Sequence, residues 1–473
     1  MKILFVVNDV GFIDPLSVAL LSGVARDLGH ERYLCILRQQ ELTEWVKRIK
    51  PDVIAYSLNS CDATEVFNAH SKIKGSAFSI MGGSHPTLYP ETLKDSGADA
   101  YCVGEGEQAF SDVLRAIEQG KPIDDIPNIH TLNKQNEPRN LMNLDEVPFP
   151  DRDLVLGNTH MGKFPRKTFL TSRGCPHRCT YCFNSALREI YKGKGKWVRR
   201  FSVDRVIKEI QDVKSKYSLS FVKFDDDNFA IKPDKWLEEF VVRYKKEIGL
   251  PFNCLIRLES ATDDMLSLLK EAGCYSITTS VDSANQRIRE TILHRDSRMN
   301  NSDIVDAMQR VKSHGINLFV NYITAIPTAI ESDELNTVRL SKAGSVVYSN
   351  YTALVPFKGT DIWCYCKEHN LYNNEDIPKS LIQPSAIKGF TVRQNRIQRN
   401  VLLLGAYNYL IPNILLNRFI ELLKNLPVSR ASAVMYSVLK SWLIGSKIYH
   451  NDTSLIEQLK VTIKATRSDL RQL

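Results

Sequence analysis

The sequence predicts an α/β protein with two α/β parts followed by a helical tail. Short apolar runs alternate with amphipathic segments over residues 1–120, and the same alternation resumes near residue 165. The final part of the chain is helical in pattern and shows no strand alternation. The 473 residues, 43% hydrophobic and 25% charged, are enough for roughly three globular domains of typical size.

The first part contains apolar runs of strand type. They are KILFVV, YLCIL, DVIAYS, AFSIMG and AYCVG, and segments such as LSVALLSGVARDLGH and EQAFSDVLRAIEQG alternate with them. Repeated βα units of this kind predict a doubly wound, flavodoxin- or Rossmann-like parallel sheet over residues 1–125. No G-x-G-x-x-G follows the first run, so a dinucleotide site is not favoured.

The second part begins after a polar, proline-rich stretch. We expect this stretch, residues 126–164, to be a linker. The runs KTFLTS, FVKFDDD, FNCLIRL, SITTSVD, INLFVNYITAI and YTALVPF then predict a partial (β/α)6 barrel of the TIM type over residues 165–365. The chemistry of such a barrel lies at the carboxyl ends of its strands. Residues 366–473 are expected to form a helical C-terminal domain.

The helical tail contains a stretch without charge, residues 400–417, which approaches the length of a membrane span. Four asparagines and Pro412 interrupt it, and each buried amide would need a partner in lipid. We therefore expect helices that cover the barrel or grip a hydrophobic substrate, and no transmembrane span. Peripheral membrane contact through Trp442, with Lys440 and Lys447 nearby, is the alternative.

The net charge, the N-terminal residues and the cysteine content bear on the partners and the cellular location of the protein. A net charge of +8 is a mild excess over so long a chain, so nucleic acid is not expected as a partner. Asp9 and Asp14 follow the first apolar run, where a signal peptide would have its cleavage site. We therefore expect a cytoplasmic protein, in which most of the ten cysteines are buried or bind metal.

Three cysteines lie close together in TSRGCPHRCTYCFN. Cys175, Cys179 and Cys182 follow the first predicted barrel strand, at the end where a barrel keeps its chemistry. Thiolates at this spacing can hold one metal centre, and four-iron clusters are bound by cysteine sulfur. Three ligands for four irons leave one iron open to a substrate or cofactor. Structural zinc, with His177 as a further ligand, is the alternative.

The motif CPHRCTYC, with an aromatic residue before its last cysteine, resembles the radical S-adenosylmethionine superfamily. The resemblance covers roughly residues 165 to 360. It implies a [4Fe-4S] cluster whose open iron is chelated by S-adenosylmethionine. It also implies an external electron donor of the flavodoxin or ferredoxin type, and reductive cleavage to a 5′-deoxyadenosyl radical.

The same resemblance implies binding residues for S-adenosylmethionine at the ends of later strands. Carboxylates would receive its ammonium group, a guanidinium its carboxylate, and polar groups its ribose. The candidates are Asp225, Asp226 and Asp227 for the ammonium, Arg257 for the carboxylate, and Asp282 and Ser283 for the ribose. A solvated acidic turn and a rim ion pair are the alternatives. The chain has Thr324, Ala325 and Thr328 where the family usually has glycine, so close backbone approach to adenine is in question there.

The segment GGSHPTLYPETLKDSGADAYCVGEGEQAF, together with VPFPDRDL, resembles the branch of this superfamily with a cobalamin (B12)-binding domain. That branch includes the anaerobic magnesium-protoporphyrin ester cyclase and many methylases. It implies that residues 1–125 bind cobalamin, with Gly82, Gly83, His85 and Thr87 as candidate contacts. NDVGFID replaces the Asp-x-His-x-x-Gly that would ligate cobalt, and we expect His85 to hydrogen-bond within its own loop.

These resemblances imply an enzyme that transfers a methyl group to an unactivated carbon of a small-molecule substrate. We consider a hydrophobic molecule among the candidates for this substrate. Radical oxidation, cyclisation or rearrangement without methyl transfer is the first alternative, and an iron–sulfur electron-transfer or sensor protein is the second. A radical methylthiotransferase is not favoured, because Cys35 and Cys102 lie within predicted strands and cannot converge with Cys61 on a second cluster. The identity of the substrate cannot be read from the sequence.

Overall fold

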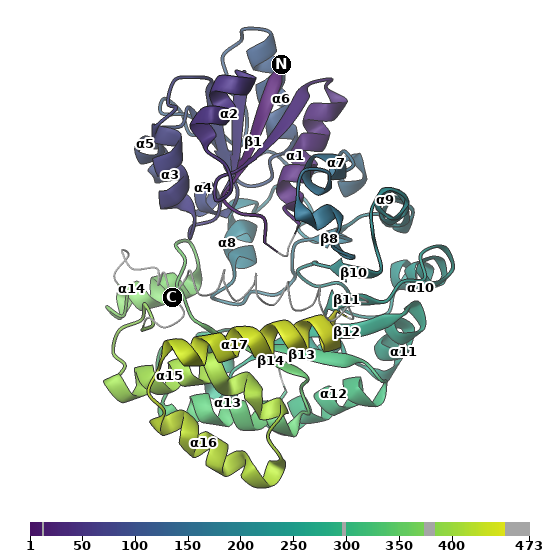
Figure 1. The fold of residues 1–473 in the computed structure, drawn as a ribbon, viewed down its shortest axis with the longest axis vertical. Helices are drawn as coiled ribbons and strands as arrows, with labels where there is room; N and C mark the ends of the chain where they lie inside the picture. Colours follow the sequence, from purple (N-terminus) through teal and green to yellow (C-terminus); the bar gives the residue numbers. More distant parts are fainter. Residues whose placement is uncertain (12–13, 296–298, 373–383, 450–473) are drawn as a thin grey trace. The chain divides into compact units, whose positions relative to one another are not determined.

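The computed structural model describes residues 1–11, 14–295, 299–372 and 384–449, and it divides the chain into two compact units (Figure 1). Unit 1 contains Met1–Thr168, Ala186–Phe201 and Glu209–Ser218. Unit 2 contains Phe169–Ser185, Ser202–Lys208 and the chain from Leu219 onward. Each unit is built on a sheet with helices, as the predicted α/β fold class requires. The expected division into four parts stays a proposal.

Unit 1 contains a sheet with the strand order β2-β1-β3-β4-β5-β6. The first five strands in the sequence are parallel, and β6 is antiparallel to β5. This is the flavodoxin-like order with one added edge strand. The strands are β1 (Lys2–Val7), β2 (Glu31–Ile36), β3 (Val53–Ser57), β4 (Phe78–Gly82), β5 (Ala100–Cys102) and β6 (Ile129–His130). The five predicted runs are therefore confirmed as strands, and β6 lies in the segment expected to be a linker.

Helices cover both faces of this sheet (Figure 1). They are α1 (Leu16–Asp27), α2 (Leu42–Ile49), α3 (Ala63–Ser71), α4 (Ser84–Leu88), α5 (Leu93–Ser96) and α6 (Glu107–Glu118). Helices α1 and α6 contact each other, while Val46 of α2 and Val66 of α3 join Leu4, Ile54 and Tyr101 of the sheet in one buried cluster. Because helices cover both faces of the sheet, the side chains on both faces of its central strands are buried. Such strands appear in the sequence as continuous apolar runs.

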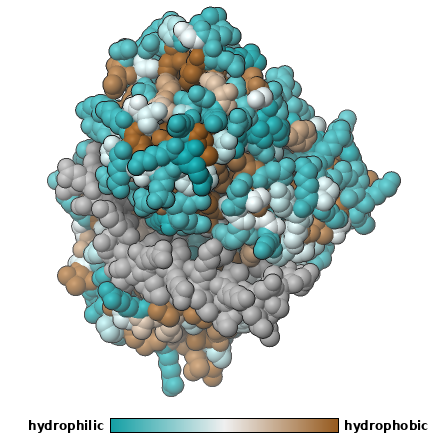
Figure 2. Space-filling view, turned by 45° about the horizontal axis from the view of Figure 1, so that its top comes forward, coloured by the Kyte–Doolittle hydropathy of each residue, from teal (hydrophilic) through white to brown (hydrophobic). Residues whose placement is uncertain are grey.

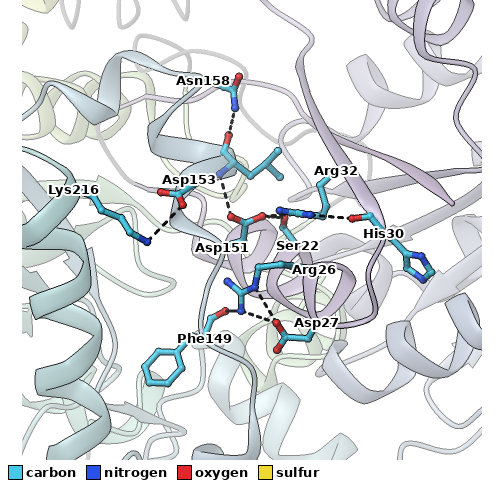
Figure 3. A network of polar contacts seen from close by, with 11 residues as sticks. Ser22, Arg26, Asp27, His30, Arg32, Phe149, Asp151, Asp153, Asn158 and Lys216 are labelled. Atoms are coloured by element: carbon cyan, nitrogen blue, oxygen red, sulfur yellow. Dashed lines mark hydrogen bonds and ion pairs between the residues drawn. The ribbon is translucent and has the colours of Figure 1, made fainter.

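Residues 149–153 pack against α1 in unit 1 (Figure 3). The buried Asp151 carboxylate accepts hydrogen bonds from the Ser22 hydroxyl at 2.6 Å and from Arg32 Nε at 3.2 Å. A Cβ atom at Gly23 would lie 2.4 Å from the carbonyl oxygen of Phe149, so only glycine allows this close approach. This stretch of the expected linker is therefore a packed part of unit 1.

Unit 2 contains most of a sheet with the order β14-β13-β12-β11-β10-β7, in which β10 to β14 run parallel. The strands are β7 (Arg166–Phe169), β10 (Phe221–Phe224), β11 (Phe252–Leu255), β12 (Cys274–Asp282), β13 (Asn317–Thr324) and β14 (Tyr348–Ala353). Helices α10 (Lys235–Glu247), α11 (Asp263–Ala272), α12 (Asn301–Ser313) and α13 (Glu331–Ala343) connect β10 to β14 in turn. The βα repeat of the predicted partial barrel is therefore present, with its carboxyl strand ends along one edge.

After β14, the described chain is helical. Its helices are α14 (Asp361–Glu368), α15 (Val392–Leu404), α16 (Leu416–Asn425) and α17 (Arg430–Leu443). Asn400, in the stretch without charge, donates hydrogen bonds to the carbonyl oxygens of Leu423 and Leu426 at 2.8 and 2.7 Å. Asn408 likewise donates to the carbonyl oxygen of Val338 at 3.2 Å. The side-chain N–H groups of the two buried asparagines in this stretch therefore find partners inside unit 2.

Among the residues that the structure describes, no helix has both the length and the apolar character needed to cross a bilayer. The face shown in Figure 2 mixes hydrophilic and hydrophobic residues. Trp442 on α17 is 46% exposed, and the Lys440 ammonium lies 5.2 Å from the centre of the Tyr436 ring. Contact of this helix with a membrane surface stays a proposal.

Candidate functional site

Three cysteines lie on one loop of unit 2, between β7 and α8 (Phe183–Ile190). Cys179 is buried, with 8% of its surface exposed, whereas Cys175 and Cys182 are half-buried, and all three are free thiols. Burial raises the pKa of each thiol, that of Cys182 to about 11. These thiols therefore hold their protons at neutral pH until a metal displaces them.

The number of these thiols suits a four-iron cluster better than a structural zinc ion. A structural zinc ion needs four ligands converging on one atom, whereas the cysteines of a four-iron cluster bind different irons. Three separate thiols on one loop therefore fit a [4Fe-4S] cluster with one open iron.

Asp227 connects the two ends of this cysteine loop. Its Oδ2 accepts a hydrogen bond from the Gly174 N–H at 3.2 Å, and its Oδ1 accepts one from Asn184 Nδ2 at 2.6 Å. Gly174 directly precedes Cys175, and Asn184 comes two residues after Cys182. Burial raises the pKa of Asp227, although both hydrogen bonds act to lower it. The turn after β10 is thus bound to the start and the end of the loop.

The two preceding aspartates have different surroundings. Asp226 is 2% exposed, and its Oδ1 accepts hydrogen bonds from the Thr171 N–H at 2.9 Å and the Ser172 hydroxyl at 2.6 Å. Burial raises the pKa of Asp226 to about 6. The side chain of Asp225 is 41% exposed and forms an ion pair with Lys223 at 2.7 Å. Three adjacent carboxylates therefore have three different environments.

Buried aromatic rings hold this acidic turn in place. Phe224 precedes the turn and Phe229 follows it, and their ring centroids lie 5.2 Å apart. Both also pack against Phe240 of α10, at 5.6 and 5.4 Å. Aromatic pairs of this kind contribute about 0.5–1.5 kcal/mol beyond the burial of their surface. The turn is therefore anchored on both sides.

Arg257, after β11, is buried and pairs with Glu259. Its Nε and Nη2 lie 3.2 and 2.6 Å from the two carboxylate oxygens, which is a bidentate geometry. Burial acts to raise the pKa of Glu259, but Arg257, helped by Arg295, outweighs burial and lowers this pKa to about 2. The ion pair named above as the alternative is therefore present. Binding of a cofactor carboxylate by Arg257 stays a proposal.

Asp282, at the end of β12, is bound to the cysteine loop. Its Oδ2 accepts a hydrogen bond from the Tyr181 hydroxyl at 2.8 Å and lies 3.2 Å from Arg295 Nε. Asp282 is buried and has a φ of 71°, in the left-handed region. The neighbouring Ser283 is also buried, and its hydroxyl accepts a hydrogen bond from the Asn285 N–H at 3.1 Å.

Two residues after β13 adopt the backbone conformation that glycine favours. Ala325 has a φ of 58° and Thr328 a φ of 68°. The Ala325 N–H donates a hydrogen bond of 2.9 Å to Glu334, whose pKa burial raises to about 8. The left-handed backbone conformation therefore forms at these two positions although neither residue is glycine, whereas Thr324 does not adopt it.

In unit 1, the backbone conformation and close neighbours of residue 83 require a glycine at this position. It has a φ of 107°, and a Cβ atom there would lie 2.5 Å from the carbonyl oxygen of Leu58, whereas one at Gly82 would meet nothing closer than 3.8 Å. The Thr87 hydroxyl donates to the Gly83 carbonyl oxygen at 2.8 Å and accepts from the Gly104 N–H at 3.0 Å. Thr87 therefore joins the loops that follow β4 and β5.

Both ring nitrogens of His85 lie within hydrogen-bond distance of hydroxyl groups. Nδ1 is 3.2 Å from Ser60 Oγ, and Nε2 is 3.2 Å from Thr92 Oγ1. The ring also stacks on Tyr89, with 5.0 Å between centroids. Burial lowers the pKa of His85 to about 4, so the ring is neutral at pH 7. A cobalt ion could bind this residue only after one of these hydrogen bonds had broken.

In unit 1, the edge of the sheet at which the parallel strands end contains a hydrogen-bond acceptor for a polar ligand. Ligands of open α/β sheets bind where the strand order reverses, which here is between β1 and β3. Asn8 follows β1, is buried, and donates hydrogen bonds of 2.8 Å to Asp62 and Glu65. Its Oδ1 has no partner within the described residues. A buried acceptor at this place fits a bound cofactor with hydrogen-bond donors.

Three residues of these sites were not predicted as such from the sequence: Asn184, Arg295 and Glu334. The only available signal for Asn184 was its place beside the last cysteine. Arg295 reaches the cysteine loop, and Glu334 reaches Ala325, through the tertiary fold. No local sequence pattern marks either residue.

Two family models match the chain. The B12 binding domain matches residues 3–114, within unit 1. The Radical SAM superfamily matches residues 169–340, a range that contains the three cysteines and the carboxyl ends of β10 to β13.

Three known proteins are similar to most of the chain. An uncharacterized methyltransferase of Pyrococcus horikoshii is 27% identical over 427 residues, which are 86% of this chain and 90% of that protein. The anaerobic magnesium-protoporphyrin IX monomethyl ester cyclase of Rubrivivax gelatinosus is 20% identical, over 74% of this chain and 65% of its own. The structure of the radical S-adenosylmethionine methyltransferase TsrM from Kitasatospora setae, with cobalamin and a [4Fe-4S] cluster bound, shares the fold over 99% of each chain, with a TM-score of 0.65 and 14% identity.

Proposed function

This chain belongs to the radical S-adenosylmethionine superfamily and carries a B12 binding domain, and from this premise we propose that it is a cobalamin-dependent methyltransferase. The observation that carries the proposal is the presence of both domains in one chain, with three free cysteines on the loop after β7. The methyltransferase relative, which spans 86% of the chain, supports methyl transfer. The acceptor that we propose is an unactivated carbon of a small molecule.

The residues of unit 2 supply the binding groups for this chemistry. When bound, the cluster supplies an electron to S-adenosylmethionine and cobalamin carries a methyl group. The three cysteines hold the cluster, and Asp227, fixed at both ends of their loop, is our candidate for the ammonium group of S-adenosylmethionine. Arg257 is the candidate for its carboxylate, and Asp282 and Ser283 are the candidates for its ribose. All four residues follow or end neighbouring parallel strands, and this common edge supports the proposal.

The partners follow from the same chemistry. We propose that a flavodoxin- or ferredoxin-type protein supplies the electron, since reductive cleavage of S-adenosylmethionine needs one electron from outside the cluster. We also propose a cytoplasmic location, where thiols stay reduced and available to iron.

Radical cyclisation or oxidation without methyl transfer is the second candidate function, and the cyclase relative supports it. Product analysis separates the two candidates. With its true substrate and a low-potential reductant, a methyltransferase of this kind yields both S-adenosylhomocysteine and 5′-deoxyadenosine. A cyclase yields 5′-deoxyadenosine alone. Chromatography of the reaction products from cobalamin-loaded protein that showed 5′-deoxyadenosine without S-adenosylhomocysteine would reject methyl transfer.

A further inference from the structure

A cavity of about 850 Å³ lies in unit 2 at the amino ends of β13 and β14. Ile316, which directly precedes β13, and Val346, just before β14, are buried and form an apolar part of its lining. The eight residues of β13 extend over about 23 Å from this edge of the sheet to the carboxyl edge. The cavity is therefore separate from the residues proposed to bind S-adenosylmethionine.

Three cationic side chains line this cavity, and no carboxylate is among its lining residues. Lys312 lies in the last turn of α12, Lys342 lies in the last turn of α13, and Arg339 lies one turn before Lys342. Within the described residues, neither lysine ammonium has an ion pair or a hydrogen bond, and Arg339 donates to the Asn336 amide oxygen at 2.9 Å. Positive charges around one cavity repel one another, and an anion between them would be stabilised by all three.

The two lysines have no necessary role as hydrogen-bond donors at the ends of their helices. A cation in the last turn can stabilise a helix, but here the last carbonyl oxygens have other partners. The Gly315 N–H donates to the carbonyl oxygen of Lys312 at 2.9 Å, and the Lys270 ammonium donates to that of Gly315 at 2.8 Å. The Gln309 amide donates to the carbonyl oxygen of Ala343 at 3.2 Å. The ammonium groups of Lys312 and Lys342 are therefore available to a ligand.

Part of the cavity wall comes from the end of the uncharged stretch, between α15 and α16. One side of this segment lines the cavity through Tyr409, Asn413 and Leu416. Its other side carries three large apolar side chains that are exposed to solvent: Leu410 (48%), Ile414 (89%) and Leu415 (40%). The first turn of α16 contains no acidic residue. Exposed apolar groups beside a cationic cavity are typical of an interaction surface.

We propose that this face of unit 2 docks on a membrane surface, with the phosphate group of an anionic phospholipid in the cavity and Leu410, Ile414 and Leu415 inserted among the acyl chains. A soluble phosphate would leave the three exposed apolar side chains without a role, and an uncharged apolar partner would leave the three cations without one. An anionic phospholipid bilayer supplies both chemistries at one surface, and peripheral proteins bind it through the same combination of apolar and basic groups.

Cosedimentation of the full chain with lipid vesicles tests this proposal. One set of vesicles contains equal amounts of phosphatidylcholine and phosphatidylglycerol, and the other contains phosphatidylcholine alone. We expect binding to the anionic vesicles only, and weaker binding as salt is added. Ile414→Asp removes an inserted side chain and adds a repelled charge, so we expect at least about tenfold weaker binding. Lys312→Gln and Lys342→Gln should each weaken binding roughly fivefold.

Val392→Asp is the matched control. Val392 is 87% exposed, close to the exposure of Ile414, and lies in the first turn of α15. The next residue, Arg393, pairs at 3.2 Å with Glu331, at the end of α13 remote from Lys342. We expect Val392→Asp to bind vesicles as wild type does. Trp442→Ser tests the alternative that α17 makes the membrane contact, and it should also bind as wild type.

Several results would overturn the proposal. They are a wild type that does not bind anionic vesicles, an Ile414→Asp variant or a pair of lysine variants that bind as wild type, and a Val392→Asp or Trp442→Ser variant that loses as much binding as Ile414→Asp. Binding of glycerol 3-phosphate in solution without binding to vesicles would assign the cavity to a soluble phosphate and would also overturn it. If Ile414→Asp has a lowered melting temperature, Leu410→Ser replaces it in the same comparison.

Discussion

Asn184 donates a hydrogen bond of 2.6 Å to Asp227, and this bond ties the end of the cysteine loop to the turn after β10. The other oxygen of the same carboxylate binds the Gly174 N–H, directly before the first cysteine. Hydrogen bonds to a charged group contribute about 1.5–3 kcal/mol each. One side chain therefore binds both ends of the loop.

Replacing Asp227 by alanine should make the cluster easier to remove. Since the loop loses two hydrogen bonds, we expect the reconstituted variant to lose iron to a chelator at least tenfold faster than wild type, where a tenfold change corresponds to about 1.4 kcal/mol. Anaerobic decay of the cluster absorbance measures the rate. Asp225→Ala is the control, because the Asp225 carboxylate pairs with Lys223. Equal rates for wild type and Asp227→Ala would contradict the clamping role.

Each cysteine of the loop should be needed for the cluster. Replacing Cys175, Cys179 or Cys182 by alanine removes one of three ligands, so we expect the reconstituted protein to bind little iron. Cys61 and Cys364 are exposed thiols outside this loop, and alanine at either position should leave four irons per chain. Iron and sulfide analysis provides the measurement. An intact cluster in the Cys179→Ala variant would refute the assignment.

Asp226 should make the stability of the cluster-free protein depend on pH. Its pKa is about 6 in the folded chain, against an ordinary value of 3.8, so the folded state holds this proton more tightly. The resulting stabilisation is present below pH 3.8 and is lost as the pH rises through 6. The separation corresponds to about 3 kcal/mol. Asp226→Asn cannot ionise and should lack this contribution.

Urea denaturation at pH 4.5 and pH 7.5 tests this expectation. The free energy of unfolding of the wild type should fall between the two pH values by more than that of Asp226→Asn. Other groups titrate equally in both proteins, so the difference between the proteins isolates this carboxyl group. The same change in both proteins would show that Asp226 is not a group with a raised pKa.

Much of the fold of unit 1 was predictable because the central strands of its sheet are buried on both faces. Such strands are continuous apolar runs, and KILFVV at residues 2–7 coincides with β1. The two-residue strand β6 was missed, because it is too short to show a period in a proline-rich segment. The cysteine loop was predictable because its ligands are neighbours in the sequence.

The surroundings of these ligands were not predictable. Thr180 binds the carbonyl oxygen of Ile292, 112 residues away, and Tyr181 binds Asp282, which pairs with Arg295. Asp225, Asp226 and Asp227 are chemically identical and adjacent. Which of them faces the loop depends on how the flanking phenylalanines are buried, and a motif does not contain that information.

Gly83 should be essential to unit 1, unlike its neighbour Gly82. With φ 107° and ψ −166°, Gly83 lies in a region that is nearly exclusive to glycine, and a Cβ atom would lie 2.5 Å from the carbonyl oxygen of Leu58. Gly83→Ala is expected to destabilise unit 1 by about 2 kcal/mol or more. Gly82→Ala meets only ordinary contacts and serves as the control. Urea unfolding of the full chain measures both variants, and equal midpoints would contradict the prediction.

Methyl transfer by way of bound cobalamin can be measured before the substrate is known. The full chain, loaded anaerobically with cobalamin and iron–sulfur cluster and then reduced, is mixed with S-adenosylmethionine that carries a radiolabelled methyl group. We expect radioactivity in the cobalamin fraction, together with an equal amount of S-adenosylhomocysteine. Protein that binds cobalamin and an intact cluster but yields neither labelled cobalamin nor S-adenosylhomocysteine would contradict the assignment as a cobalamin-dependent methyltransferase.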